Sequence, residues 1–284
     1  MRAFYPLQTL CRVLSVSTSG FADWHRCGGP VHWLSDMQLL TLIRSIYAEF
    51  KGAYGAPRIY RELKSRGYPV SKTRVRIMMQ QHGIRGRHKR RYKVTTDSKH
   101  SLPVAPNTLN REFNMAAPDK AWTVDITYIP TREGWLYLAV VMDLYSRAIV
   151  GWAMDSRMTR ELVMGALRMA RFRRDPAPGL LHHSDRGSQY CSHDYKGLLQ
   201  EYGMQVSMSR KGNCWDSAPM ESFFNRLKNE RVFHDDYATR AAAKQDLFEY
   251  IEVFYNRKRS HSSIGYRTPA QHYAAWFEQE RRAA

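Results

Sequence analysis

The sequence predicts an α/β protein. We expect a mixed sheet of three antiparallel and two parallel strands, flanked by helices and preceded by a small all-α helix-turn-helix domain. Three observations support this. Residues 36–81 show helical periodicity, residues 121–154 contain three β-type runs joined by short turns, and residues 159–208 alternate helical and strand patterns. Three strands followed by alternating helices and strands are typical of a mixed sheet covered by helices.

Net charge indicates a polyanionic partner. The 284 residues carry a net charge of +18, and residues 1–93 hold 18 Lys or Arg against 4 Asp or Glu, whereas the rest holds 26 against 22. Such an excess is typical of proteins that bind nucleic acid or an anionic membrane. The sequence has no run of about 18 apolar residues, so we expect no membrane-spanning helix and no membrane partner.

The N-terminal segment, residues 1–35, has no long apolar stretch typical of a secretory signal. The four cysteines are widely spaced and indicate reduced cytoplasmic thiols. Cys27 lies near His25 and His32, but this spacing fits no standard zinc site, so no zinc is expected.

Residues 36–93 predict a helix-turn-helix domain with a basic arm. Ser35 or Asp36 can cap a first helix. Its apolar stripe consists of Leu39, Leu42, Ile43 and Ile46. Pro57 suits the first turn of a second helix, which carries Ile59 and Leu63 at i,i+4. Ser71 caps a third helix, which ends at Gly83 as the residue after the C-cap.

A generic helical hairpin would show the same spacing, but the run RGRHKRRYK at 85–93 favours DNA binding, because six of its nine residues are Lys or Arg. The expected DNA contacts of this domain are Lys72, Arg74, Arg76, Arg85, Arg87, Lys89, Arg90 and Arg91. Residues 94–118 show little periodicity and are predicted to be a linker.

Residues 119–275 predict the mixed-sheet core, and residues 276–284 a C-terminal tail. The first strand, AWTVDITYIP, alternates apolar and polar residues, and Glu133-Gly134 marks a turn into a second strand at 135–143. A third strand follows at 147–154, and an amphipathic helix at 159–172. A short strand then ends at Asp185, followed by a helix, a second short strand and a final helix.

Three carboxylates occupy positions where this sheet could bring them together. Asp125 lies in the middle of the first strand, where a charge is costly unless another charge meets it. Asp185 lies at the end of another strand, where sheet proteins place ligands. Glu221 lies near the start of a helix whose first turn contains Pro219. Asn225 and Lys228 follow Glu221 at i+4 and i+7 on the same helix face, where we expect DNA contacts.

Converging carboxylates suit hard divalent cations, because Mg²⁺ prefers oxygen ligands. Two such ions can activate an attacking oxygen and stabilise the leaving oxygen of a phosphodiester. A recombinase with a covalent intermediate would instead need a nucleophile beside an Arg/His cluster. Tyr190, beside Arg186 and His193, is a weaker candidate for that role.

The segments WTVDITYI, HHSDRGSQY and GNCWDSAPMESFFNRLK resemble the Asp-Asp-Glu motifs of the retroviral-integrase superfamily, with 35 residues between Asp185 and Glu221. YLAVVMDLYSRAIVGW and YNRKRSHSSIGYRTPAQHY are similar to the second-reading-frame protein of the insertion-sequence-three family of transposases. The resemblance covers essentially the whole chain.

This resemblance implies a ribonuclease H-like core in which Asp125, Asp185 and Glu221 bind two ions of Mg²⁺ or Mn²⁺ and catalyse cleavage at transposon ends and strand transfer. Lys228 matches the integrase lysine that contacts the terminal DNA. The partners implied are the double-stranded DNA of transposon ends and target, other copies of the chain, and a first-reading-frame protein or fusion segment. The expected location is the bacterial cytoplasm, at the nucleoid.

The sequence departs from the family pattern at Asp216-Ser217-Ala218, where Asp-Asn-Ala is frequent, and this puts a supporting hydrogen bond in doubt. Two other functions remain open from the residues. One is a structure-selective nuclease of the same fold, and the other is a DNA-binding regulator without catalysis. Three clustered acids argue against the regulator, because they would repel phosphates.

Overall fold

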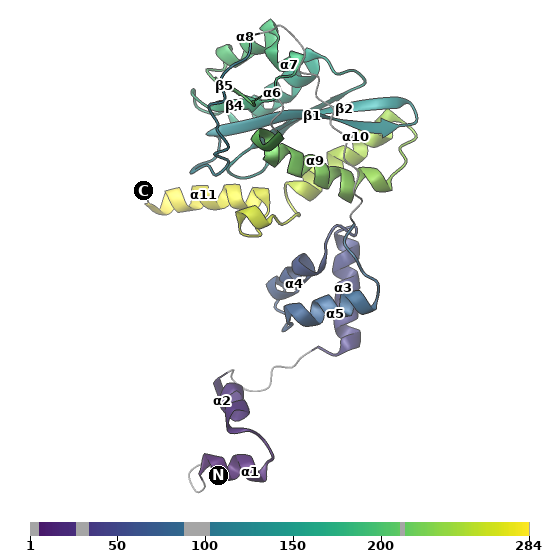
Figure 1. Ribbon diagram of the computed structural model, residues 1–284, viewed down its shortest axis with the longest axis vertical. Helices are drawn as coiled ribbons and strands as arrows, with labels where there is room; N and C mark the ends of the chain where they lie inside the picture. The colour runs from purple at the N-terminus through teal and green to yellow at the C-terminus, as the bar shows by residue number, and fades with distance from the viewer. Residues whose placement is uncertain (1–5, 27–33, 88–102, 211–213, 284) are drawn as a thin grey trace. The chain divides into compact units, whose positions relative to one another are not determined.

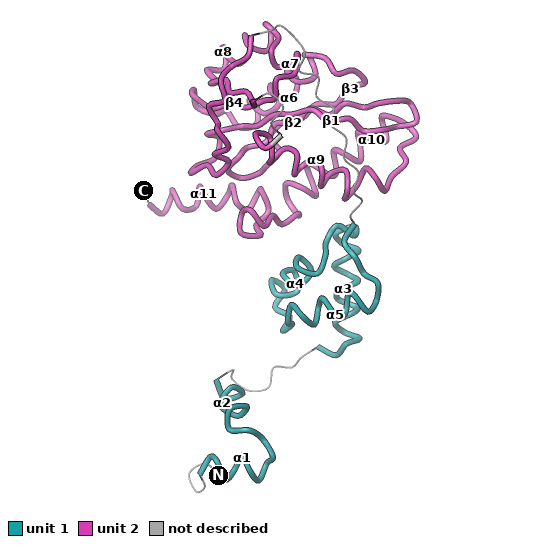
Figure 2. Tube along the Cα trace, in the orientation of Figure 1, with its two compact units in different colours: residues 1–87 teal, residues 88–284 magenta. Residues whose placement is uncertain are grey.

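The computed structural model describes residues 6–26, 34–87, 103–210 and 214–283. The chain forms two compact units, residues 1–87 and 88–284 (Figure 2). Lys89, Arg90 and Arg91, and the cysteine and histidine at 27 and 32, lie outside the described residues. Within the described ranges, the structure contains no helix that is both long and apolar enough to span a membrane.

The first unit contains the three predicted helices, α3 (Asp36–Glu49), α4 (Ala56–Ser65) and α5 (Lys72–Gln81) (Figure 1). The caps form as expected: Ser35 accepts from the Gln38 N–H and the Gln38 side chain accepts from the Ser35 N–H, so α3 begins with a capping box. The Ser71 hydroxyl caps α5. Gly83, with φ of +64°, follows the last turn of α5 in the left-handed conformation that glycine tolerates best.

The apolar stripes of these helices form the core of the first unit. Its fully buried side chains are Leu39, Ile43, Ile46, Tyr54, Ile59, Leu63 and Val75. Two further helices, α1 (Leu7–Val13) and α2 (Thr18–Arg26), lie in the N-terminal segment, for which the sequence predicted no elements. Their local signals are weak, because α1 has no side-chain N-cap and α2 has no buried residues.

The second unit is built on a five-stranded sheet with the order β3-β2-β1-β4-β5 (Figure 1). Its strands are β1 (Ala121–Thr131), β2 (Gly134–Asp143), β3 (Ile149–Asp155), β4 (Leu181–Ser184) and β5 (Gln205–Met208). The first three strands pair antiparallel, whereas β4 pairs parallel with both β1 and β5. The predicted mixed, ribonuclease H-like sheet is therefore confirmed.

Helices cover both faces of this sheet (Figure 1). On one face, α6 (Arg160–Arg174), α7 (Ser188–Cys191) and α8 (His193–Glu201) pack on the apolar side chains of β1 and β2. On the other, α9 (Ala218–Glu230) and α10 (Arg240–Phe248) contact β1 and β2. A π-helical segment, η3 (Glu249–Tyr255), and the terminal helix α11 (Pro269–Ala283) follow. Short 3-10 turns are η1 (Cys214–Ser217), η2 (Val232–His234) and η4 (Ser262–Ile264).

Helix α6 approaches β3 closely because Gly151 has no side chain. A Cβ at this position would lie 2.2 Å from the Ala166 carbonyl oxygen and 2.7 Å from the Ala170 nitrogen. Ala166 and Ala170 are themselves small and buried, so backbone meets backbone at this contact. The approach fixes α6 against the sheet that carries the candidate site.

Strand β4 contains a buried histidine that should make the fold sensitive to acid. The Nε2 atom of His182 lies 2.9 Å from the Tyr195 hydroxyl, and burial, aided by the neighbouring His183, lowers the pKa of His182 to about 3. In the unfolded chain His182 has an ordinary pKa near 6.5, so it binds a proton at pH values at which it stays neutral in the folded chain. The contribution of His182 therefore lowers the free energy of unfolding as the pH falls below about 6.5, and this loss grows until about pH 3.

Between pH 7 and pH 5 we expect a loss of about 2 kcal/mol from His182 in the free energy of unfolding. Urea denaturation at the two pH values measures it. His182→Gln should lower stability at pH 7 but flatten the dependence on pH, because glutamine does not titrate in this range. An equally steep dependence in the variant would show that other groups cause the acid sensitivity.

Candidate active site

The sheet register places Asp125 beside Asp185. Strands β1 and β4 pair parallel, with Thr123 opposite His183, and the same offset continued by two residues sets Asp125 opposite Asp185. Neighbouring strands lie about 4.8 Å apart. The two carboxylates therefore meet at the point where β4 ends and β1 continues in its pairing with β2.

Each aspartate is oriented by a local backbone N–H. The Oδ1 atom of Asp125 accepts from the Ile126 N–H at 2.7 Å, and the Oδ1 atom of Asp185 accepts from the Gly187 N–H at 2.8 Å. Both residues are half-buried. The turn after β4 thus holds Asp185 in place.

Glu221 approaches from the other side of the sheet, in the first turn of α9. Pro219 lies at the start of this helix, as predicted, and the buried side chains of Phe223 and Leu227 anchor it. Partial burial raises the pKa of Glu221, although the residue remains exposed.

The three carboxylates interact electrostatically. Burial raises the pKa of Asp125 well above its ordinary value, and repulsion by Asp185 and Glu221 raises it further. The Ile126 N–H and the positive charge of Lys228 oppose this rise. A buried carboxylate beside two others is stabilised when a cation sits among them.

The donor set suits a hard cation, because the three side chains offer carboxylate oxygens, which Mg²⁺ and Mn²⁺ prefer. Within the ranges that the structure describes, no three His, Cys, Asp or Glu side chains are gathered closely enough to hold an ion as they stand. Asp125 and Asp185 lie on neighbouring segments where the β1–β4 pairing ends, whereas Glu221 is on a separate element and exposed.

Lys228 lies beside this cluster on the same helix as Glu221. Its Nζ atom is 4.6 Å from the centroid of the Tyr128 ring, a cation–π contact. Burial lowers the pKa of Lys228, and the negative charge of Asp125 opposes that shift. Asn225 is exposed on α9, and its side-chain oxygen accepts from Asn229.

Tyr190, the alternative nucleophile, is buried under α6 and α8 with 2% of its surface exposed. Burial raises the pKa of its hydroxyl well above the ordinary value, and the charges of Asp125 and Asp185 add to this. A neutral, buried phenol is a poor nucleophile. The arrangement therefore favours the carboxylates over Tyr190.

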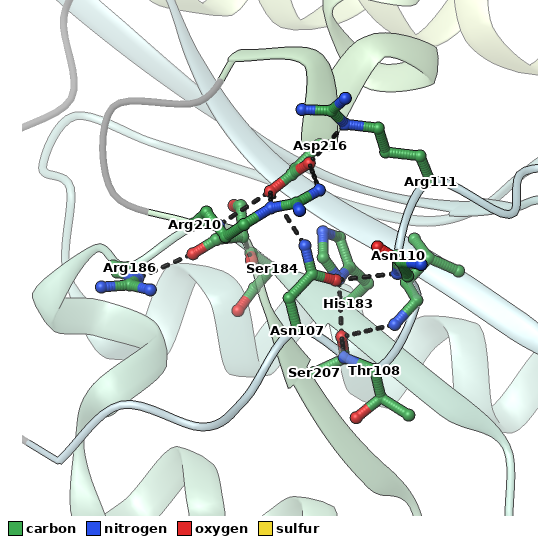
Figure 3. Close-up of polar contacts among 12 residues, drawn as sticks. Asn107, Thr108, Asn110, Arg111, His183, Ser184, Arg186, Ser207, Arg210 and Asp216 are labelled. Carbon is green, nitrogen blue, oxygen red and sulfur yellow. Dashed lines mark hydrogen bonds and ion pairs between the residues drawn. The ribbon is translucent and has the colours of Figure 1, made fainter.

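A second polar cluster precedes α9 and centres on Asp216, which is 1% exposed (Figure 3). Arg210 donates to both of its oxygens, from Nε at 2.9 Å and Nη2 at 2.8 Å, and also from its backbone N–H. Arg111 Nε and Asn107 Nδ2 donate as well, at 2.9 and 2.8 Å. These hydrogen bonds, chiefly those of Arg210, hold the pKa of the Asp216 carboxyl well below its usual range.

The same cluster ties the segment before β1 to the edge strand β5. The Ser207 hydroxyl accepts from the backbone N–H groups of Thr108 and Leu109 and lies 2.9 Å from Nδ1 of His183 (Figure 3). Arg186, next to Asp185, donates to the Ser209 carbonyl at 2.7 Å. The turns that follow β4 and β5 and the start of α9 are therefore linked by hydrogen bonds.

Sequence reasoning did not find this cluster. Asn107 and Arg111 lie 109 and 105 residues before Asp216, within a segment that has no helix or strand between residues 103 and 118. The one available signal was Asp216 itself, an acid between Trp215 and the helix that carries Glu221. At this departure from the family pattern, the Asp216 carboxylate accepts hydrogen bonds from Asn107, Arg111 and Arg210.

The expected DNA contacts of the first unit differ in their surroundings. Arg74 donates to the Leu34 carbonyl at 2.5 Å and to Asp36 at 2.6 Å, so its guanidinium is engaged with the start of α3. The side chains that remain exposed are those of Lys72, Arg76, Arg85 and Arg87.

Three family models match the chain. A model described as an integrase core domain matches residues 116–214, a second integrase core model matches residues 202–269, and an HTH-like domain matches residues 35–92. Among solved structures, the catalytic core domain of HTLV-2 integrase in complex with magnesium aligns with a TM-score of 0.42 and 16% identity. That alignment covers 56% of this chain and 98% of the integrase core.

Two curated relatives extend over nearly the full length. The "Insertion element IS600 uncharacterized 31 kDa protein" of Shigella sonnei is 44% identical over 92% of this chain and 96% of its own. The "Transposase InsF for insertion sequence IS3A" of Escherichia coli (strain K12) is 39% identical over 95% of this chain and 94% of its own. With an integrase-type core and relatives this similar along their whole length, the chain belongs to the IS3 family of insertion-sequence transposases.

Proposed function

We propose that this transposase cuts transposon ends and joins them to target DNA at a site formed by Asp125, Asp185 and Glu221. The observation that supports this most is the register of β1 and β4, which sets Asp125 opposite Asp185, with α9 bringing Glu221 to the same cluster. Family membership favours transposition over the alternatives of a structure-selective nuclease or a DNA-binding regulator.

The family is metal-dependent, and we infer that the ions here are Mg²⁺ or Mn²⁺, two per site, with Asp125 and Asp185 as the paired ligands and Glu221 as the third. When bound, such ions supply Lewis-acid activation of the attacking oxygen and charge stabilisation of the leaving oxygen. The chain's own contribution is to orient the ligands. The Ile126 and Gly187 N–H groups orient one oxygen of each aspartate, and the first turn of α9 carries Glu221.

A strand-transfer assay tests this function. The probe is labelled DNA carrying the ends of the element, incubated with supercoiled plasmid and the full chain. Cleavage and joined products should both appear with Mg²⁺ or Mn²⁺ and both disappear with EDTA. Cutting without joining would point to a nuclease, and binding without either product to a regulator.

We propose that residues 36–93 bind DNA through phosphates, with Lys72, Arg76, Arg85 and Arg87 as the exposed contacts and the basic arm continuing to residue 93. Replacing these four by Gln should make the plot of log K against log salt concentration less steep by about 3 to 4, because each lost phosphate contact removes about 0.9. Replacing Arg281 and Arg282, which are exposed at the end of α11, is the control. An unchanged slope in the fourfold variant would place the phosphate contacts elsewhere.

The partners follow from this chemistry. DNA binding and oligomerisation are properties of the transposase family. We propose that the two substrates are transposon ends and target DNA, and that several copies of the chain assemble on the DNA. A first-reading-frame protein or fused segment is proposed as a further component. An enzyme with these substrates would work at the bacterial nucleoid.

We propose that Lys228 positions the transposon end without taking part in bond making. Seven residues at about 100° each return nearly to the azimuth of Glu221, about 10 Å further along α9. Lys228→Ala should weaken end binding about tenfold or more, since it removes a charged hydrogen bond. Lys228→Glu should be worse because it repels phosphate, whereas Lys228→Arg should retain part of the binding.

Fluorescence anisotropy with labelled end DNA measures these affinities. The matched control is Lys244→Ala, at an exposed lysine on α10. Wild-type binding and strand transfer in both Lys228→Ala and Lys228→Glu would remove Lys228 from the site.

A further inference from the structure

The turn η1, immediately before the helix of Glu221, presents a large aromatic side chain to solvent. Trp215 is 70% exposed, whereas its neighbour Asp216 is 1% exposed and held by several hydrogen bonds. The anchored carboxylate holds the backbone of this turn at the residue that follows Trp215. Trp215 is therefore an exposed aromatic side chain next to an anchored residue.

Two guanidinium groups flank this turn. The side chains of Arg111 and Arg210 are 44% and 46% exposed, and each is bound to Asp216 (Figure 3). Of the five N–H donors of a guanidinium, the described contacts of Arg111 use Nε alone, and those of Arg210 use Nε and Nη2. Two cations around one anion leave a net positive charge, with donors directed to solvent.

We propose that Trp215, with Arg111 and Arg210 held by Asp216, binds the DNA strand that runs away from the reacting phosphodiester. The indole stacks on an unpaired base, and the guanidinium groups bind phosphates beside it. Arginine suits phosphate because of its planar donors, and aromatic side chains stack on any base. The combination of an aromatic face with basic side chains is the chemistry of single-strand binding.

The position of Trp215 fits this role. It precedes Glu221 by six residues, a chain length that spans at most about 20 Å. One nucleotide of a strand covers about 3.4 Å, so the stacked base lies within about six nucleotides of the phosphate at Glu221. This step rests on the proposed active site, whereas the binding surface itself does not require catalysis.

The experiment compares two probes on the full chain: a blunt duplex, and the same duplex with a single-stranded tail of thymidines containing one 2-aminopurine. Trp215→Ala should weaken binding of the tailed probe about 5- to 150-fold and remove the quenching of 2-aminopurine, while binding of the blunt duplex stays unchanged. Trp215→Phe should retain part of both signals. Phe172→Ala, at a side chain 90% exposed on α6, is the matched control and should change neither.

Arg111→Gln tests the phosphate contact. Its plot of log K against log salt concentration for the tailed probe should be less steep than that of the wild type by about 0.7, the value for one contact to a single strand. Circular dichroism confirms that each variant is folded. Asp185→Asn, which removes a proposed catalytic carboxylate, should bind the tailed probe like the wild type. The binding test therefore does not depend on whether the active-site proposal is correct.

Wild-type affinity of Trp215→Ala for the tailed probe would overturn the proposal. A change in the oligomeric state of Trp215→Ala, measured by light scattering, with unchanged DNA affinity would also overturn it. Trp215 would then belong to a contact between protein chains.

Discussion

Asp185→Asn is expected to abolish both cleavage and strand transfer while leaving DNA binding intact. The amide has the size of the carboxylate and can still accept from the Gly187 N–H, so the turn after β4 should persist. What is lost is a negative charge next to Asp125, and with it the affinity for a divalent cation. The ions supply several kcal/mol of stabilisation in the transition state, so the rate should fall at least about 10³-fold.

Asp194→Asn is the matched control, because Asp194 is an exposed aspartate of the same unit that pairs with Arg160. It should cut and join DNA at the wild-type rate. Asp125→Asn and Glu221→Gln should behave like Asp185→Asn. Any of the three that retains full activity with normal metal dependence does not belong to the ligand set.

Glu230→Gln is expected to destabilise the second unit by about 3–5 kcal/mol, the usual cost of breaking a buried ion pair from one side. Glu230 ends α9 and accepts from Arg259 at 2.5 and 2.8 Å and from the Tyr250 hydroxyl at 2.8 Å. Arg259 is 1% exposed, and Arg226 is close enough to repel it. Without the carboxylate, the buried guanidinium group of Arg259 would lose its anion while the half-buried Arg226 continued to repel it.

Chemical denaturation measures this loss, and Asp236→Asn is the control, because Asp236 forms an exposed pair with Arg132 that should contribute little. The double variant Glu230→Leu with Arg259→Met should be more stable than Glu230→Gln, since it leaves no unpaired charge at either position. Equal stability of Glu230→Gln and the wild type would show that the pair does not hold the end of α9.

Much of the second unit could be predicted because its signals are local. The alternation of apolar residues around Asp125 marks β1. The apolar stripe from Leu162 to Ala170 marks α6, which buries this stripe against the sheet. Pro219 marks the start of α9. Asp125 and Asp185 could be proposed as partners because both stand out at strand positions, although their register needed the sheet itself.

The missed features depend on contacts between distant residues. Asp216 accepts hydrogen bonds from Asn107 and Arg111, which lie more than 100 residues earlier in the chain. Sequence periodicity does not indicate such contacts. Arg74 is an expected DNA contact by its place on α5, yet Asp36 and the Leu34 carbonyl accept hydrogen bonds from its guanidinium. Neither arrangement changes the local sequence pattern, so a residue's position on an element could be predicted, but its partner could not.

The shared metal site is tested most directly by a crystal structure of the full chain with Mn²⁺ and end DNA, using anomalous scattering to locate the ions. We predict anomalous peaks within coordination distance of Asp125 and Asp185, with the Glu221 carboxylate as a further ligand. Peaks bound elsewhere, with these three carboxylates free of metal, would contradict the proposed site.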